Sequence, residues 1–438
     1  METDKTTLTD LAIFNAEEDF SVFSYLDCTQ TSNGREQLRK NLATPLNGME
    51  AIIAIQKTIK AIHAEEAKWP KYISNGTIMV MERFYGTAID ALPQRVTQME
   101  AITYKIFHGP DYSLIKYSVV HCFDFIKGMK AIHALFNAED LPIPLQRVLV
   151  QIKKLTSNPN FDVVDKFQKC TDMTIAAQLQ LAQFARFSYK HQMLEMMHIH
   201  AELDAWWGMG MAVKKYNLVF PEFSESNEPF IEVKGLYHLL LENPSPYNIS
   251  LDRKGNFLFL TGANMAGKST FIKSVGTAVF LAHTGMAVPA KQMALSVFDG
   301  LLSNINVVDN IARGESYFFN EVQRIKATIS KVNDGKKWLI LIDELFKGTN
   351  VQDAMKCSLA VIEGLLKIKN SLFILSTHLY EIGEELKAYP NIHFNYFETS
   401  VQDGQLSFSY QLKDGVSNDR LGYLILKREG VVKMLEDL

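Results

Sequence analysis

The sequence predicts a chain of two parts, an α-helical first half followed by an α/β second half. Residues 8–215 are poor in glycine and mostly helical in pattern, and residues 173–215 contain no proline. After Pro229, short apolar runs alternate with helical patterns, which is the arrangement of a mostly parallel sheet covered by helices. Proline, serine, glutamate and asparagine cluster between the two parts, so we predict domains at residues 1–220 and 221–438.

The composition is that of a globular protein with a sizeable core. Of the 438 residues, 47% are hydrophobic and 21% are charged, which argues against disorder. Lysine and arginine together number 45, against 49 aspartates and glutamates, so the net charge is −4. This balance excludes a uniformly basic coat for nucleic acid, but it leaves room for a local basic face.

The cysteines and the first residues bear on the cellular compartment. Cys28, Cys122, Cys170 and Cys357 are far apart and form no CxxC pair, which favours reduced thiols over a disulfide framework or a zinc site. The first five residues are polar and of mixed charge, unlike a secretory signal, and no run of about 18 apolar residues is present to span a membrane. We therefore expect a cytoplasmic protein with no membrane partner.

Each element is predicted by a local pattern. Residues 173–215 favour one long helix or two consecutive ones, acting either as a spacer or lever or as part of a plain bundle. Residues 393–400 and 406–412 flank an Asp-Gly pair and predict a hairpin at the edge of the sheet. Three apolar runs predict buried strands, and the helical pattern between the last two completes a βαβ unit. These runs are Phe257–Leu260, Trp338–Ile342 and Leu372–Leu375.

The clearest chemical signal is a glycine-rich loop between the first of these strands and a helical run. Residues 262–269 read GANMAGKS and fit the pattern GxxxxGK[ST], in the strand–loop–helix context that the pattern requires. Glycines allow backbone N–H groups to wrap a phosphate at a helix N-terminus. We predict that Lys268 reaches the β- and γ-phosphates and that the Ser269 hydroxyl ligates Mg²⁺. The predicted binding residues are Gly262, Ala263, Asn264, Met265, Ala266, Gly267, Lys268, Ser269 and Thr270.

Polar residues also follow the next two apolar strands at their carboxyl ends, where ligands of open α/β sheets bind. Asp343 follows the strand at residues 338–342 and is predicted to hold Mg²⁺. Glu344 comes next and is predicted to polarise the attacking water as general base. His378 follows the strand at residues 372–375. It is either a residue that senses the γ-phosphate or an ordinary loop histidine.

These motifs resemble those of the MutS family of DNA mismatch repair ATPases, within the ABC ATPase superfamily. The pair Asn264 and Met265 is characteristic of the phosphate loop of that family. The resemblance is most specific after about residue 257 and extends more diffusely to the first half. It rests on residues 261–270, 288–290, 298–301, 309–321, 343–350, 377–378 and 413–417, and in the first half on residues 10–14, 26–29 and 201–204.

The resemblance implies an α-helical core and lever domain followed by an ABC-type P-loop ATPase domain. It implies ATP and Mg²⁺ as cofactors and Mg-dependent hydrolysis of ATP to ADP and phosphate. In this interpretation Lys268, Glu344 and His378 are the catalytic residues. Ser269 and Asp343 are the metal ligands.

Two further site residues take their roles from the resemblance. Composite sites in a homodimer are implied, in which Ser316 of the signature region meets the γ-phosphate held by the partner subunit. An aromatic residue commonly stacks on adenine in this superfamily, and Tyr247 is the candidate, with simple packing as the alternative. The chain departs from the family at Phe346 and Lys347, where the family has a glycine-arginine pair.

The resemblance also implies double-stranded DNA, bound without sequence specificity, as a partner, together with repair proteins. Because the core pattern begins within ten residues of Met1, we expect no mismatch-reading or connector domain and a reduced DNA clamp. The leading interpretation is therefore a MutS-like ATP-dependent DNA-binding protein. One alternative is an ATP-gated scaffold for a protein or a structured RNA, and another is a switch that binds ATP but hydrolyses it poorly. A basic concave surface at the helical end favours DNA, whereas an apolar or acidic surface favours the scaffold.

Overall fold

The computed structural model describes residues 1–15, 17–89, 92, 96–136, 140–306, 317–402, 405–417 and 430–436. The chain forms two compact units. Unit 1 comprises Met1–Tyr25, Pro45–Ile53 and Tyr216–Leu438, and unit 2 comprises Leu26–Thr44 and Ala54–Lys215. The chain thus combines helices with mixed α/β sheets, as the sequence predicts. The division differs from the predicted one, because residues 1–25 and 45–53 group with the α/β part.

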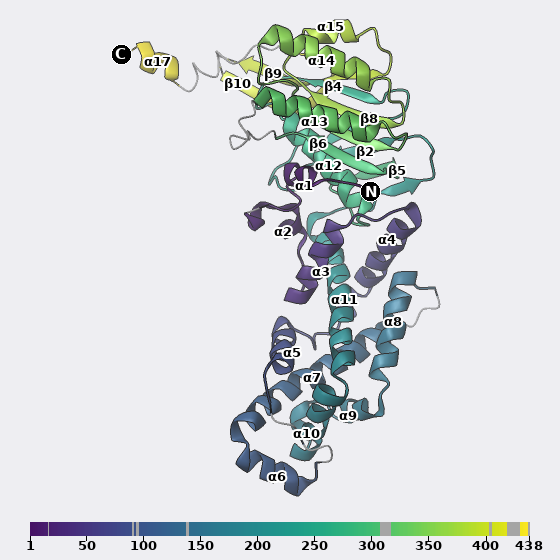
Figure 1. Ribbon diagram of the computed structural model, residues 1–438, viewed down its shortest axis with the longest axis vertical. Helices are drawn as coiled ribbons and strands as arrows, with labels where there is room; N and C mark the ends of the chain where they lie inside the picture. The colour runs from purple at the N-terminus through teal and green to yellow at the C-terminus, as the bar shows by residue number, and fades with distance from the viewer. Residues whose placement is uncertain are drawn as a thin grey trace. The chain divides into compact units, whose positions relative to one another are not determined.

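Unit 2 is helical throughout its described residues (Figure 1). None of the helices in the described part of the chain combines the length and the apolar character that a bilayer crossing needs. The helices are α3 (Ser32–Ala43), α4 (Met49–Ala64, from Ala54 on), α5 (Asn75–Gly86), α6 (Gln98–Phe107), α7 (Gly109–Leu135), α8 (Ile143–Thr156), α9 (Asp162–Lys166), α10 (Ile175–Gln183) and α11 (Lys190–Tyr216, to Lys215), with short 3-10 turns at Glu66–Lys68, Pro159–Phe161 and Cys170–Asp172.

The segment predicted as one long helix or two consecutive ones is two helices. A π-helical turn, Phe184–Ser188, separates α10 from α11, and the Tyr189 N–H donates to the Phe184 carbonyl at 2.8 Å. Within α11, a Cβ at Gly208 would lie 2.9 Å from the backbone nitrogen of Thr29. Gly208 therefore allows α11 to approach the segment at Thr29 closely. The helix does not end at this glycine.

A buried carboxylate joins the two ends of unit 2. Asp204 of α11 is 3% exposed and accepts hydrogen bonds from the backbone N–H groups of Gln30 and Thr31, both at 2.9 Å. The Thr31 hydroxyl donates to the same carboxylate at 2.6 Å. Burial raises the pKa of Asp204, and these donors oppose the rise. Gly34 leaves room for the carboxylate, since a Cβ there would meet Asp204 Oδ2 at 2.1 Å.

Unit 1 is built around a six-stranded sheet of order β10-β9-β4-β8-β7-β6 (Figure 1). The pairs from β9 to β6 are parallel, and β10 runs antiparallel to β9. The three predicted buried strands and the predicted hairpin are all present. The strands are β4 (Phe257–Thr261), β6 (Gly300–Asn304), β7 (Trp338–Asp343), β8 (Ser371–Ser376), β9 (Ile392–Gln402) and β10 (Gln405–Asp414).

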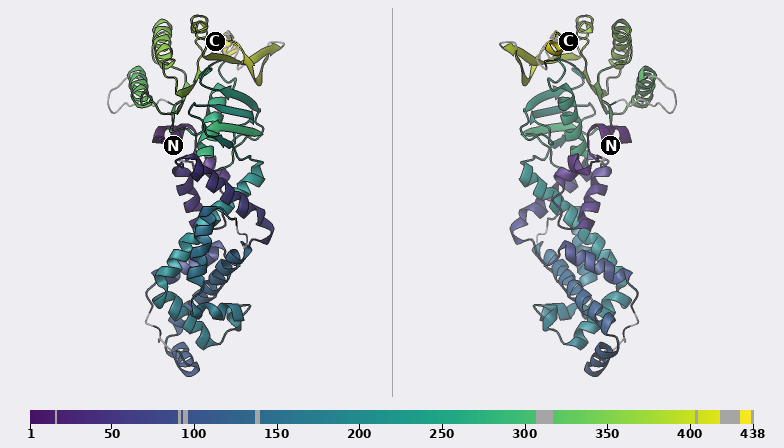
Figure 2. Two further views of the ribbon diagram at one scale, coloured as in Figure 1. Left: turned by 90° about the vertical axis from the view of Figure 1, so that its right-hand side faces the viewer. Right: turned by 90° about the vertical axis from the view of Figure 1, so that its left-hand side faces the viewer.

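Helices cover both faces of this sheet (Figures 1 and 2). Successive residues of a strand point to opposite faces, so the strands present apolar side chains to the helices on each side. Phe259, Ile340 and Phe373 pack in one apolar cluster with residues of α13 (Tyr317–Val332), α14 (Val351–Leu365) and α15 (Ile382–Leu386). On the other face lies α12 (Lys268–His283), where a Cβ at Gly276 would come within 2.5 Å of Leu341 Cδ1.

A second sheet and several short elements complete unit 1. This sheet has the order β1-β5-β2-β3, and all of its pairs are antiparallel except β1 with β5. Its strands are β1 (Glu222–Ser224), β2 (Ile231–Leu236), β3 (Tyr247–Leu251) and β5 (Gln292–Ser296). The remaining helices are α1 (Lys5–Asp10), a 3-10 turn (Glu18–Phe20), α2 (Val22–Leu26, to Tyr25) and α17 (Val431–Glu436).

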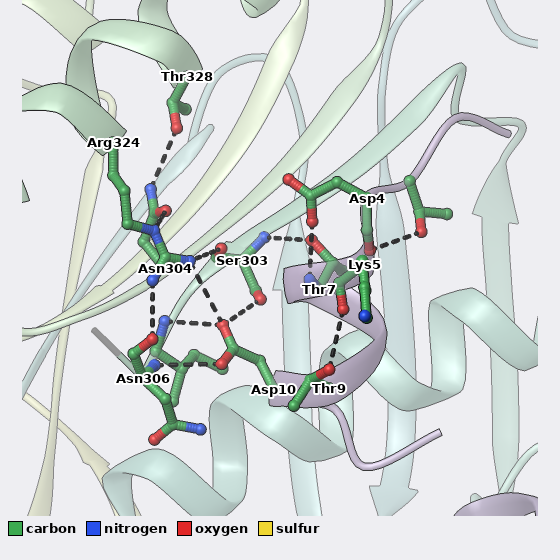
Figure 3. Close-up of polar contacts among 12 residues, drawn as sticks. Asp4, Lys5, Thr7, Thr9, Asp10, Ser303, Asn304, Asn306, Arg324 and Thr328 are labelled. Carbon is green, nitrogen blue, oxygen red and sulfur yellow. Dashed lines mark hydrogen bonds and ion pairs between the residues drawn. The ribbon is translucent and has the colours of Figure 1, made fainter. Parts of the chain in front are cut away.

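The first helix belongs to unit 1 through one buried carboxylate (Figure 3). Asp10, 1% exposed, accepts from the Ser303 hydroxyl at 2.6 Å and from the backbone N–H groups of Ile305 at 3.0 Å and Asn306 at 3.2 Å. The Thr7 hydroxyl accepts the Ser303 N–H at 3.0 Å. Arg324 of α13 completes the group by donating to the backbone carbonyls of Ser303 and Asn306. These bonds explain why α1 groups with the end of β6.

Candidate functional site

The glycine-rich loop joins β4 to α12 in a conformation that glycines make accessible. Gly262 has φ = 140° and Gly267 has φ = 107°, while the exposed Met265 has φ = 70°. The Lys268 ammonium is buried and donates to the carbonyls of Gly262 at 2.8 Å and Ala263 at 3.0 Å. Burial lowers the pKa of Lys268, and the nearby carboxylates of Glu344 and Asp343 oppose that shift. The loop thus holds a cation at the N-terminus of a helix.

Asp343 lies beside this cation at the end of β7. The Ser269 hydroxyl donates to Asp343 Oδ2 at 2.5 Å, and the Ser376 hydroxyl at the end of β8 donates to Asp343 Oδ1. The strands β7 and β8 are parallel and in register at this point, with Asp343 opposite Ser376. The sheet therefore brings together the carboxylate and hydroxyl oxygens that Mg²⁺ prefers as ligands.

Three basic side chains, His378, Lys347 and Lys268, act on the Glu344 carboxylate. Glu344 Oε1 is 3.6 Å from His378 Nδ1, and Glu344 Oε2 is 3.3 Å from Lys347 Nζ. His378 contributes most to lowering the pKa of Glu344 to about 2, burial opposes this, and Lys347 and Lys268 add to the lowering. The carboxylate is therefore ionised at neutral pH. In this arrangement it is a strong hydrogen-bond acceptor and a weak proton acceptor.

The turn after β7 has an unusual backbone. Glu344 has φ = 65° and Phe346 has φ = 58°, both in the left-handed region that non-glycine residues rarely occupy. Glu321 of α13 holds the turn by accepting from the N–H groups of Lys347 at 3.3 Å and Gly348 at 3.4 Å. The Phe346 ring packs on Phe318, with ring centroids 5.6 Å apart. This packing offsets the backbone strain at Phe346. A glycine would adopt the same positive φ angle without strain.

A pocket of about 490 Å³ opens at the loop. Its size is within the range of small-molecule sites. It is lined by Leu241, Glu242, Asn243, Ser245, Tyr247, Ala263, Asn264, Met265, Gly267, Lys268, Ser269, Thr270, Glu344 and Tyr410. Most of the loop residues predicted from the sequence therefore line one cavity together with Glu344.

Of the two tyrosines in the pocket, Tyr410 has the more accessible ring. Tyr247 is 5% exposed, and its ring is fixed edge to face against Phe271 and Phe397, at interplanar angles of 87° and 86°. Tyr410 is 43% exposed and lies where the register of β10 shifts, with φ = 51°. Tyr410 Cδ1 lies 3.4 Å from where a Cβ at Gly267 would be. Tyr247 is thus packed on two rings, whereas the Tyr410 ring is partly exposed and contacts Phe408, with ring centroids 6.1 Å apart.

The predicted residues converge with few exceptions. Gly262 contacts the Lys268 ammonium through its carbonyl, Asp343 joins through Ser269, and His378 joins through Glu344. Ala266, within the loop, is buried. Ser316 falls outside the described residues. Sequence reasoning did not point to Tyr410, because only the order of the strands brings the hairpin beside the loop. It also did not point to the ion pair of Lys347 with Glu344, although the two residues are only three positions apart.

The donor set can be tested against the implied cofactors. Within the described part of the chain, no group of three or more His, Cys, Asp or Glu side chains is placed to hold a metal. Ser269 and Asp343 alone supply two oxygens, so a cation here needs phosphate and water oxygens to complete its shell, as Mg²⁺ does with nucleotides. The residues present therefore fit Mg²⁺ bound together with a phosphate.

Comparisons with known proteins bear on the same part of the chain. The family model of MutS domain V matches residues 258–435. The DNA mismatch repair protein MutS of Thermotoga maritima is 30% identical over 247 residues, 56% of this chain and 30% of that protein. MutS of Staphylococcus haemolyticus is 28% identical over 295 residues, 63% of this chain and 32% of that protein. MutS of Staphylococcus aureus is 26% identical over 291 residues, 63% of this chain and 33% of that protein.

The chain thus spans about a third of the length of the curated relatives that it matches. The matched family segment contains the glycine-rich loop, the ends of β7 and β8, and the hairpin that carries Tyr410. Most of the residues that line the pocket therefore lie within the matched family segment. The matches over this C-terminal part support a protein of the MutS family.

Proposed function

We propose that the chain binds and hydrolyses MgATP at the carboxyl edge of the six-stranded sheet. The observation that carries this proposal is the hydrogen bond between Ser269 and Asp343, 2.5 Å long, beside the buried ammonium of Lys268. Ser269 and Asp343 would hold the Mg²⁺, and Lys268, released from the loop carbonyls, would donate to the β- and γ-phosphates. Mg²⁺ bound there would supply positive charge that stabilises the phosphates, and the Lys268 ammonium would add to it.

Glu344 has the task of holding the attacking water. With its pKa lowered to about 2, it accepts a hydrogen bond from water more readily than it accepts a proton. His378, 3.6 Å from the carboxylate, fixes its direction and approaches the γ-phosphate. The ion pair of Glu344 with Lys347 competes for the same oxygens. This competition supports the alternative of a switch that hydrolyses ATP slowly.

Tyr410 is the aromatic residue that we assign to the base of the nucleotide. Its ring lies at the mouth of the pocket and is 43% exposed, whereas Tyr247 is 5% exposed. Stacking needs an open ring face, which only Tyr410 offers among the tyrosines of the pocket. Tyr247 then supports the loop from beneath, next to Phe271 and Phe397.

The dimer and the wider role follow from the family. The signature serine, Ser316, would complete the site of a partner subunit, so that ATP joins two copies. Because the relatives are named DNA mismatch repair proteins, we propose that this ATPase acts in DNA mismatch repair or a related DNA transaction, with double-stranded DNA as partner. One observation favours the scaffold as second candidate. The outer side of α6 in unit 2 is apolar, with Met99 80% and Phe107 76% exposed, and is not basic.

Binding of ATP by Lys268→Ala tests the nucleotide site directly. We expect the dissociation constant for MgATP, measured by calorimetry, to rise by about 10- to 100-fold, which corresponds to the loss of charge-assisted hydrogen bonds. The matched control is Lys273→Ala, in the same helix but outside the pocket lining. Equal affinities of the two variants would contradict the proposal.

A DNA panel tests the wider role. The panel contains homoduplex, mismatched duplex, junction and single strand, each with and without ATP. We expect duplex binding that changes with ATP in the parent chain and does not change in Lys268→Ala. Binding of none of the four DNAs, together with intact ATP hydrolysis, would leave the ATPase standing and transfer the wider role to the scaffold.

A further inference from the structure

The helix α6 carries apolar side chains on the side that faces away from the rest of unit 2. It lies at one end of that unit (Figures 1 and 2) and begins with a capping box between Thr97 and Glu100. Four of its apolar residues are largely exposed. Met99 is 80% exposed, Ile102 51%, Ile106 69% and Phe107 76%, and we call these four the α6 face.

The α6 face lies opposite the side by which the helix packs. Ala101 is fully buried and Tyr104 is 7% exposed, and both point into unit 2. With about 100° of rotation per residue, the α6 face is centred roughly 180° from these two positions. A helix that is apolar on both sides requires a second apolar surface, and exposed apolar patches of several hundred Å² mark interaction sites.

We propose that the α6 face pairs with the α6 face of a second copy of this chain. The spacing of Met99, Ile102 and Ile106, three and then four residues apart, is that of a helix–helix seam. The four side chains expose roughly 500 Å² per copy, so pairing buries roughly 1,000 Å², the lower bound of specific interfaces. An interface of this size is expected to give a weak dimer whose population depends on concentration.

The charges beside the α6 face select the direction of pairing. Glu100 and Lys105 lie on its two opposite edges, about 110° to either side of its centre. A two-fold axis parallel to the helices places the Glu100 edge of one copy beside the Lys105 edge of the other, on both sides of the seam. The antiparallel arrangement would place like charges together. One acid and one base also give no net positive charge for a phosphate backbone, which disfavours DNA as the occupant.

This interface is separate from the ATP site and does not depend on nucleotide. We therefore expect sedimentation velocity without ATP to show a monomer–dimer equilibrium in the micromolar range, which Lys268→Ala leaves unchanged. Failure of the proposed ATPase and failure of this interface are thus distinguishable.

The first experiment introduces a charge into the α6 face. Ile106→Lys is expected to raise the dimer dissociation constant at least tenfold, because it buries two like charges in the seam. The matched control is Val150→Lys, at a position on α8 that is 67% exposed and should leave the constant unchanged. Both positions face solvent, so circular dichroism should show that both variants fold.

The second experiment tests direction by cross-linking. In a background of Cys28→Ser and Cys357→Ser, single cysteines at Met99, Ile102 and Ile106 are each expected to form disulfide-linked dimers under mild oxidation, since parallel pairing sets each residue against its own copy. Glu82→Cys, at an exposed position of α5, should stay uncross-linked. Cross-linking only at Ile102 would overturn the parallel arrangement.

Two results would overturn the proposal as a whole. One is a parent chain that remains monomeric at 100 μM without ATP and forms no disulfide at any of the three positions. The other is a dimer that Ile106→Lys leaves intact while the variant loses binding to a duplex or to another protein. That second result would assign the α6 face to that partner.

Discussion

Two buried carboxylates, one in each unit, differ in the groups that donate to them. Asp204 of unit 2 is 3% exposed and bound by two backbone N–H groups and one hydroxyl. Asp343 of unit 1 is 8% exposed, and its described partners are the hydroxyls of Ser269 and Ser376. A backbone N–H only donates, whereas a hydroxyl can turn and offer a lone pair to a cation. The same burial therefore serves to fix the fold in one unit and permits metal binding in the other.

The kind of hydrogen-bond partner, more than the degree of burial, separates a structural carboxylate from one that can take part in chemistry. Around Asp204 the donors among the described residues all belong to Gln30 and Thr31, which are adjacent in the chain. Around Asp343 the donors are side chains at the ends of separate elements. The following experiments test this difference, beginning with the largest expected effect.

Replacing Glu344 with glutamine tests the chemical side of the comparison. The amide cannot hold the attacking water as the carboxylate does, so we expect the rate of ATP hydrolysis to fall by about 100- to 10,000-fold, with ATP affinity retained. Steady-state phosphate release and calorimetric binding measure the two quantities. Glu384→Gln is the control, because Glu384 is 74% exposed in a surface ion pair with Lys387. An equal loss in both variants would remove Glu344 from the reaction.

Replacing Asp204 with alanine tests the structural side. The change leaves buried N–H and hydroxyl donors without an acceptor, so we expect the free energy of unfolding to fall by about 3 kcal/mol. Urea denaturation followed by circular dichroism measures this loss. ATP affinity should stay within about twofold of the parent chain at a temperature where the variant is folded. A stable variant with impaired nucleotide binding would break the distinction between the two carboxylates.

Two buried histidines extend the comparison to pH. Burial lowers the pKa of His200 in unit 2 and of His283 in unit 1 to about 4. The His283 ring lies between the Val279 carbonyl at 2.8 Å and the Phe298 N–H at 2.9 Å, an arrangement that requires the neutral form. Both histidines are thus structural, although they belong to different units.

The sign of their effect follows from proton linkage. Between pH 6.5 and about 4 the unfolded chain binds protons that the folded chain does not, so stability falls as pH falls, by about 1.4 kcal/mol per pH unit for each histidine. Urea titrations at pH 7.5, 6.0 and 5.0 measure this slope. His200→Leu should reduce the slope by one proton relative to the parent. An unchanged slope would show that His200 does not stay neutral in the folded chain.

The smallest expected effect is at Tyr410. Loss of a stacking surface in Tyr410→Ala should weaken MgATP binding about fivefold, which corresponds to about 1 kcal/mol, and Tyr410→Phe should restore it. Fluorescent nucleotide titration measures the affinities. Affinity that is equally low in Tyr410→Phe would assign the effect to the hydroxyl, and hence not to stacking.

Local patterns account for much of the fold and for the loop. The strands β4, β7 and β8 are continuous apolar runs because helices cover both of their faces, and such runs are visible in the sequence. The loop needs positive φ angles, which explains why glycine occurs in it. By contrast, the contacts of Asp10 with Ser303 and of Tyr410 with the loop depend on the order of strands in the sheet. Sequence spacing carries no signal for such long-range contacts.

The apolar outer side of α6 was also hidden from sequence reasoning. Met99, Ile102 and Ile106 have the spacing of core residues, and Ala101 and Tyr104 share the same ten-residue helix. A pattern with apolar residues on both sides does not show which side is buried. Only the packing of α6 against α7 and α10 settles that choice.

The bonds of Asp10 also set the time at which unit 1 can be completed during synthesis. Asp10 is bonded to Ser303, Ile305 and Asn306, which are 293, 295 and 296 residues further along the chain. At about 5–20 residues per second, a ribosome takes roughly 15–60 s to make that stretch. The amino-terminal helix must wait through that interval while all of unit 2 is synthesised.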